Sequence, residues 1–190
     1  MHRHMAAWLL GMVTATAASA GPVPGDAAKP MLFPAGDAQV QIITGSPVTE
    51  DEARLLAGVV AGQPYFGAIA ISPDEKLLES KATIAVANFH STDAAGRAAR
   101  RQCDALRTGA APCVVVALLR PTGWQKRPLS LSSEATAGFL ADYPGSKGAL
   151  AISATTGAWG IAAGAGAADA AVKACAAKSA DKDCTVVVAD

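Results

Sequence analysis

One stretch of this chain occurs twice in related form, and this internal similarity constrains the fold more than any other feature. The first copy opens with GAIAIS at Gly67 and closes with CVVVA at Cys113. The second copy opens with GALAIS at Gly148 and closes with CTVVVA at Cys184. The first copy also carries an insertion, residues 73–81, where the second has only a short turn. The similarity predicts two units with the same fold.

Each copy is expected to form a strand, a turn, a second strand, a helix and a third strand. The apolar opening runs are rich in Ile and Ala and fit buried strands, and residues 82–89 and 158–163 supply the second strands. The Ala-rich segments 93–103 and 167–178 favour helices because they contain few β-branched residues. The Val-rich closing runs favour central strands, because branched side chains suit a pleated surface.

A further helix is expected before each copy. Thr49 and Glu52 have the spacing of a capping box, so residues 49–61 are predicted to be helical. Residues 133–143 are the counterpart before the second copy. Residues 38–44 are predicted to form an additional edge strand.

These elements predict an α+β fold in which the two β-β-α-β units share one mixed sheet covered by helices. Residues 37–190 would form this duplicated domain, with the first copy at about 49–119, a linker at 120–131 and the second copy at about 132–190. The helix between the second and third strands of each copy requires a crossover connection. Two separate lobes are the alternative, although so small a unit is only marginally stable alone.

The four cysteines fall at matching places in the two copies. One lies near the end of each predicted helix and one precedes each Val-rich strand, which selects the local pairs Cys103–Cys113 and Cys175–Cys184. A bridge that closes a loop of about ten residues stabilises the fold by roughly 2.5–3 kcal/mol. A redox pair or a four-thiolate metal site is the alternative, but the spacing differs from the CxxC clusters that such sites use.

The first 20 residues have the features of a secretory signal peptide. A short basic start precedes an apolar middle, and Ala18-Ser19-Ala20 is an A-x-A site, so cleavage is expected after Ala20. Export to the periplasm or the exterior would supply the oxidising compartment that the two bridges require. The Pro- and Gly-rich segment 21–36 is expected to be an extended, poorly ordered lead-in.

Charge and hydropathy narrow the function classes. The chain holds 16 Lys and Arg against 16 Asp and Glu, which argues against nucleic acid or anionic lipid as a partner. No apolar run beyond the signal peptide reaches membrane-spanning length, so the mature protein is not expected to be integral to a membrane.

The repeated motifs resemble those of a family of small secreted bacterial proteins that is known only as a domain of unknown function. The shared features are the G-A-[IL]-A opening strand, an aromatic residue in the second strand (Trp159), the A-x-x-x-C helix end and the C-x-V-V closing strand. The resemblance covers half of the mature chain, in two copies. It implies secretion and local disulfides, and it carries no catalytic residues.

No catalytic or metal motif stands out, and no cofactor is expected. His90 is the only histidine beyond the signal peptide. Ser91, Thr92 and Asp93 follow it directly, but neighbours in sequence do not make a catalytic triad, whose members converge from separate elements. One of these three residues is expected to cap the following helix.

Two features favour binding rather than catalysis. Arg97, Arg100 and Arg101 fall at helical spacings and form a basic strip, for which a solvated helix face is the alternative. Trp124 lies in the linker between basic residues, in a Pro- and Gly-bounded loop typical of recognition. A hydrophobic lid over the seam between the copies is the alternative for this side chain. The insertion 73–81 is a further place for a partner-specific loop.

We therefore expect an exported, non-enzymatic binding or interaction module of the cell envelope, whose partner is an envelope protein or a small ligand. The alternative is a small, hydrolase-like envelope enzyme that uses His90 in a cleft between the copies. A purely structural envelope protein is a third hypothesis. An acid and a nucleophile within hydrogen-bond reach of His90 would favour the enzyme.

Overall fold

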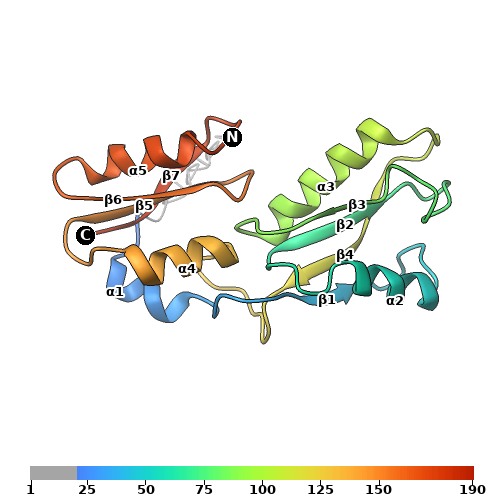
Figure 1. Cartoon of the computed structure of the whole chain (residues 1–190), viewed down its shortest axis with the longest axis horizontal. Helices are drawn as coiled ribbons and strands as arrows, with labels where there is room; N and C mark the ends of the chain where they lie inside the picture. Colours follow the sequence, from blue (N-terminus) through green and yellow to red (C-terminus); the bar gives the residue numbers. More distant parts are fainter. Residues whose placement is uncertain (1–20) are drawn as a thin grey trace, which may run out of the picture.

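Residues 21–190 are described by the computed structural model, so the predicted signal peptide lies outside the described residues. This part of the chain has an α+β fold with two separate antiparallel sheets, which lie side by side along the long axis of the molecule (Figure 1). The α+β class is confirmed. The prediction of one mixed sheet is wrong.

The first sheet has the strand order β1-β4-β2-β3. Helix α2 packs on one face of this sheet and α3 on the other (Figure 1). We call these six elements the first unit. Its elements are β1 (Gln39–Ile42), α2 (Glu50–Val59), β2 (Gly67–Ile71), β3 (Ile84–Val86), α3 (Thr92–Leu106) and β4 (Val114–Arg120).

The second sheet has the strand order β6-β5-β7. Helix α5 packs on one face, whereas α4 and the lead-in pack on the other (Figure 1). We call this part, including the lead-in, the second unit. Its elements are α1 (Gly25–Ala28), the short 3-10 helix η1 (Lys29–Met31), α4 (Ser133–Asp142), β5 (Gly148–Ser153), β6 (Trp159–Ala163), α5 (Ala167–Ala176) and β7 (Cys184–Ala189).

The two units have the same strand pairing. In each, the central strand pairs antiparallel with both neighbours, so the strands joined by the helical crossover are parallel to each other. The register shifts between Ile69 and Ala70 in the first unit and between Leu150 and Ala151 in the second, which are matching positions of the two apolar runs. The crossover expected from the sequence therefore has the same position in both units.

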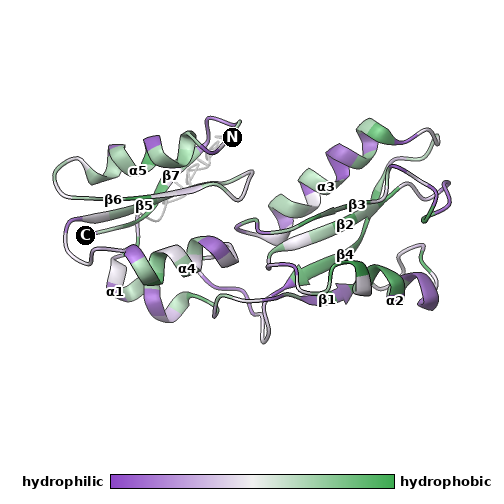
Figure 2. Ribbon diagram, viewed as in Figure 1, coloured by the Kyte–Doolittle hydropathy of each residue, from purple (hydrophilic) through white to green (hydrophobic). Residues whose placement is uncertain are grey.

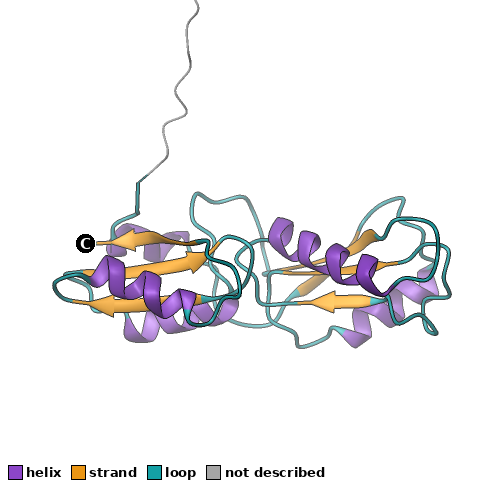
Figure 3. Cartoon of the chain, turned by 90° about the horizontal axis from the view of Figure 1, so that it is seen from above, coloured by secondary structure: helices purple, strands orange, loops and turns teal. Residues whose placement is uncertain are grey.

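The sheets stay separate because each one already buries both of its faces. The first sheet has one apolar cluster under α2 and another under α3, and the second sheet has one under α4 and another under α5. Figure 3 shows the two helix-covered sheets from above. Since the faces are covered within each unit, joining the sheets would bury little further apolar surface.

The lead-in differs from the expected poorly ordered segment. It forms two short helical elements, α1 and η1, and Ala28 is fully buried in the cluster under α4. Val23 pairs with β7, because its N–H donates to the Val187 carbonyl and its carbonyl accepts from the Ala189 N–H. The apolar side chains of the lead-in thus complete the second unit.

The local signals in the sequence predict the helix starts and the disulfides correctly. Thr49 and Glu52 form the predicted capping box at the start of α2, and the Ser91 side chain caps α3. The bridges Cys103–Cys113 and Cys175–Cys184 are both present, with Cα–Cα distances of 6.0 and 6.1 Å. Each bridge fixes the end of a helix to the start of the next strand.

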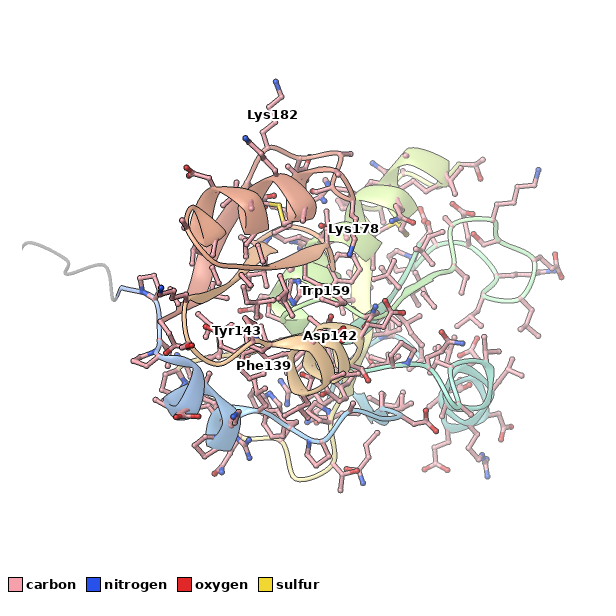
Figure 4. All side chains as sticks on the ribbon, turned by 60° about the vertical axis from the view of Figure 1, so that its left-hand side comes forward. Phe139, Asp142, Tyr143, Trp159, Lys178 and Lys182 are labelled. Carbon is pink, nitrogen blue, oxygen red and sulfur yellow. A yellow bond between two sulfur atoms is a disulfide. The ribbon has the colours of Figure 1, made fainter. Side chains whose placement is uncertain are left out.

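Trp159 shows how closely helix and strand approach in the second unit. Its ring lies near Phe139 of α4 and Lys178, whose Nζ is 4.4 Å from the ring centroid (Figure 4). Gly138 of α4 permits this contact, because a Cβ there would overlap the indole. Gly160, which follows Trp159, packs closely against α5. A Cβ at this position would lie 2.5 Å from the Ala171 carbonyl oxygen and 2.5 Å from the Cys175 nitrogen.

We predict that Gly160→Ala destabilises the protein by about 1–3 kcal/mol, because the backbone of α5 must move to admit the methyl group. Gly58→Ala is the matched control: it lies in α2 with open space around its Cβ position, so it should stabilise by about 0.5–1 kcal/mol. Urea unfolding at neutral pH measures both free energies. Equal effects of the two substitutions would contradict the close packing of α5 on β6.

Candidate functional site

Trp124 lies at a pocket of about 270 Å³ between the linker and the start of α3, which we call the linker pocket. The side chains of Arg120, Lys126 and Arg127 line it together with Trp124. The N-cap Ser91 and the first two residues of α3, Thr92 and Asp93, form another part of the wall. The predicted recognition residue therefore lies in a cavity with three cationic side chains, and its indole is 37% exposed.

A second pocket, of about 340 Å³, shares Arg120 and Trp124 with the linker pocket and is also lined by β1. We call it the β1 pocket; Gln39 and Gln41 supply polar groups to it. The Arg120 guanidinium lies 3.9 Å from the centroid of the Trp124 ring, and its Nη1 donates a 2.6 Å hydrogen bond to Gln41. The stacked Arg120 and Trp124 thus form a wall shared by both pockets.

The three cations of the linker pocket have different local roles. Arg127 donates to the carbonyls of Met31 and Leu32 and stacks on the Phe33 ring at 3.7 Å, so it fixes the lead-in. Arg120 carries a buried Nε with no hydrogen-bond partner within residues 21–190.

Lys126 is the most available of the three. It is exposed and makes no hydrogen bond or ion pair in this part of the chain. None of the ion pairs of the described residues neutralises any of the three cations. Asp93 is the acidic residue of the lining, so the linker pocket carries a net positive charge that favours an anionic ligand.

The basic strip does not join this site. Arg97, Arg100 and Arg101 are exposed on α3, and none of them lines the linker pocket or the β1 pocket. No ion pair within the described residues involves the strip. The sequence-predicted binding residues thus fall at two places on the first unit, and only Trp124 lies in a cavity.

His90 lies in the seam between the two units and is only 5% exposed. Its Nδ1 accepts a 2.9 Å hydrogen bond from the Ser132 N–H at the start of α4. Its Nε2 donates to the Ala158 carbonyl at 3.0 Å, which assigns the ring proton to Nε2. Both ring nitrogens are therefore occupied by backbone groups of the second unit.

Further contacts support the same seam. Asn88, with a φ of 64°, accepts a hydrogen bond on its side chain from the Glu134 N–H. Tyr65 contacts Thr136 of α4 and donates to the Phe33 carbonyl at 3.2 Å. Phe33 itself packs edge-on against Tyr65 and Phe66. These contacts orient the two units and thereby place the linker beside the start of α3.

The insertion 73–81 turns its acidic side chains toward its own disulfide loop. Asp74 accepts from the N–H groups of residues 110 and 111, and Glu75 accepts from those of residues 108 and 109. The hydrogen bond from Ser80 and those backbone donors lower the pKa of Glu75 to about 2. The insertion has a structural contact here, whereas its proposed role as a partner-specific loop stays a prediction.

Comparisons with protein-family models, with curated proteins and with solved structures give no match to this chain. The resemblance to the secreted family therefore stays a prediction.

Within residues 21–190, no helix has the length and apolar character that crossing a lipid bilayer requires. The same residues contain no group of His, Cys, Asp and Glu side chains arranged to hold a metal ion.

The buried His90 should make stability depend on pH. Burial lowers its pKa, so unfolding takes up a proton once the pH falls below the ordinary value of about 6.5. The stabilisation by neutral His90 is full above that pH and is lost as the pH falls toward the native pKa. The charge of Asp183 acts on the ring in the opposite direction and raises its pKa.

We predict that the free energy of urea unfolding falls between about pH 7.5 and pH 5.5 in the wild type and changes much less in His90→Gln. His90→Gln should also be less stable at pH 7.5, because it cannot make both backbone hydrogen bonds with the same geometry. A wild-type stability that stays constant over this range would contradict the neutral, buried ring.

At lower pH, Glu75 should contribute to a second loss of stability. Because its native pKa of about 2 lies below its ordinary value of 4.5, its stabilisation is present above pH 4.5 and is lost as the pH falls toward 2. We predict that Glu75→Gln lowers the melting temperature at pH 7 and that its difference from the wild type shrinks toward pH 2. Glu79→Gln, an exposed residue of the same insertion, should behave like the wild type at both pH values.

Proposed function

We propose that this protein is an exported, non-enzymatic binding module of the cell envelope, which holds an anionic ligand at the stacked Arg120 and Trp124. One observation carries the proposal: three cations without acidic partners in the described chain surround an exposed tryptophan in a pocket. Exposed aromatic and Arg side chains at a concave surface are typical of residues that dominate binding. The charge around them selects for anionic groups.

The enzyme hypothesis has less support. A general base needs a free nitrogen near a reacting proton, and both nitrogens of His90 are held by backbone groups. The partners of the ring are an N–H and a carbonyl, which orient it but supply no nucleophile. The arrangement therefore favours a structural role for His90 in the seam.

Export and duplication are further parts of the proposal. Two disulfides in so small a chain are typical of oxidising compartments, and they agree with the signal peptide that the sequence predicts. We propose that the two units arose by duplication of one unit. The order β4-β2-β3 in the first sheet matches β7-β5-β6 in the second, and this shared order and the matching register shifts support this origin.

The proposal is tested by immobilising the disulfide-bonded protein, residues 21–190, and passing envelope extract over it. We expect the wild type to retain a component that both Trp124→Ala and Lys126→Gln release, and the retention should weaken as salt screens the pocket charge. Lys182→Gln is the matched control, because this lysine projects away from the second unit (Figure 4). If every variant retains the same components as the wild type, the linker pocket is not the binding site.

A further inference from the structure

The two pockets around Arg120 and Trp124 offer different chemistry. The linker pocket presents cations, whereas the β1 pocket presents the side-chain amides of Gln39 and Gln41. Amide side chains donate and accept hydrogen bonds, so they match the N–H and C=O groups of a peptide backbone. Cations match carboxylates. A ligand that uses both pockets must carry amides and a negative charge.

The position of β1 leaves room for such a ligand. β1 is the terminal strand of the first sheet, and no further strand of the described residues pairs with it; residues 37 and 38, just before β1, pair with Gln63 and Pro64. The exposed residues of β1 are Gln39 and Gln41, and hydrophilic colour is visible along this strand in Figure 2. The backbone of Gln39 pairs with Arg120 of β4, but its exposed side chain has no hydrogen-bond partner in the described chain, so the side-chain amide is free to bind.

The wall between the pockets adds an apolar contact. The Trp124 side chain is partly exposed. The preceding residue, Gly123, has a φ of 67°, a left-handed conformation that forms a turn. An apolar side chain that crosses this wall would cover the indole, while a carboxylate beside it reaches Lys126 or Arg120. Small inorganic anions and single acidic residues would occupy the linker pocket alone and leave the β1 pocket unused.

We propose that the ligand is an extended acidic peptide segment, with an apolar residue on Trp124, carboxylates at the cations of the linker pocket and its backbone at the glutamines of the β1 pocket. This inference rests on the proposed function, because it names the ligand class of the same site. The charge complementarity of the linker pocket selects acidic over basic peptides.

Calorimetric titration with the probe acetyl-Gly-Glu-Leu-Glu-Gly-amide tests this ligand class. We expect saturable binding, and we expect the neutral analogue with Gln in place of Glu to bind about tenfold or more weakly, since charged hydrogen bonds are stronger than neutral ones. Acetyl-Glu-amide, which has the charge but not the length, should also bind much more weakly. Equal binding of either analogue and the probe overturns the proposal.

Variants of the two pockets separate their contributions. Lys126→Gln should weaken binding of the acidic probe about tenfold and leave binding of the neutral analogue unchanged. Gln39→Ala should weaken the binding of both peptides but not that of acetyl-Glu-amide, because the substitution removes a side-chain amide of the β1 pocket. Lys182→Gln should bind the probe like the wild type. A Lys126→Gln variant that binds the probe with unchanged affinity contradicts the assigned carboxylate site.

The two proposals fail in different ways. If the probe does not bind while Trp124→Ala still releases a component from envelope extract, the peptide class is wrong and the binding module stands. If Trp124→Ala and the wild type retain the same components, the proposed function itself is wrong. Binding of acetyl-Glu-amide as tight as that of the probe assigns the site to a small anion instead.

Discussion

A buried imidazole joins the two units by two hydrogen bonds, and no side chain of residues 21–190 makes more across the seam. His90 accepts from the Ser132 N–H and donates to the Ala158 carbonyl, so a residue of the first unit satisfies two backbone groups of the second. A neutral ring with its proton on Nε2 fits both partners. A charged ring would also carry a proton on Nδ1, which would then face the Ser132 N–H, donor against donor. Because Ser132 follows the linker directly, the same contact fixes where the linker ends.

Much of the fold follows from local sequence signals. The cysteine positions predict both bridges, the spacing of Thr49 and Glu52 predicts the start of α2, and the apolar runs predict the central strands. These signals act between neighbours in sequence, where spacing and residue type decide the outcome. The number of sheets could not be predicted in this way, because apolar periodicity shows which face of a strand is buried but not which other strand pairs with its edge.

The site was only partly predictable for a similar reason. Trp124 stands out among polar neighbours, but residues 91–93 come to the pocket from a segment about 30 residues earlier in the chain, which spacing around Trp124 does not reveal. The partners of His90 are backbone groups, which leave no trace in the residue types of the second unit. The basic strip on α3 matches a binding pattern in sequence, yet it lies outside both pockets, because helical spacing says nothing about what the exposed face meets.

The pairing of the lead-in with β7 makes the second unit discontinuous. The Gly25 N–H donates to the Asp190 side chain across a sequence separation of 165 residues, and Val23 lies against β7. The first unit closes through shorter loops and pays less chain entropy for its contacts. The second unit is therefore complete only when the first and last residues of the described chain lie together.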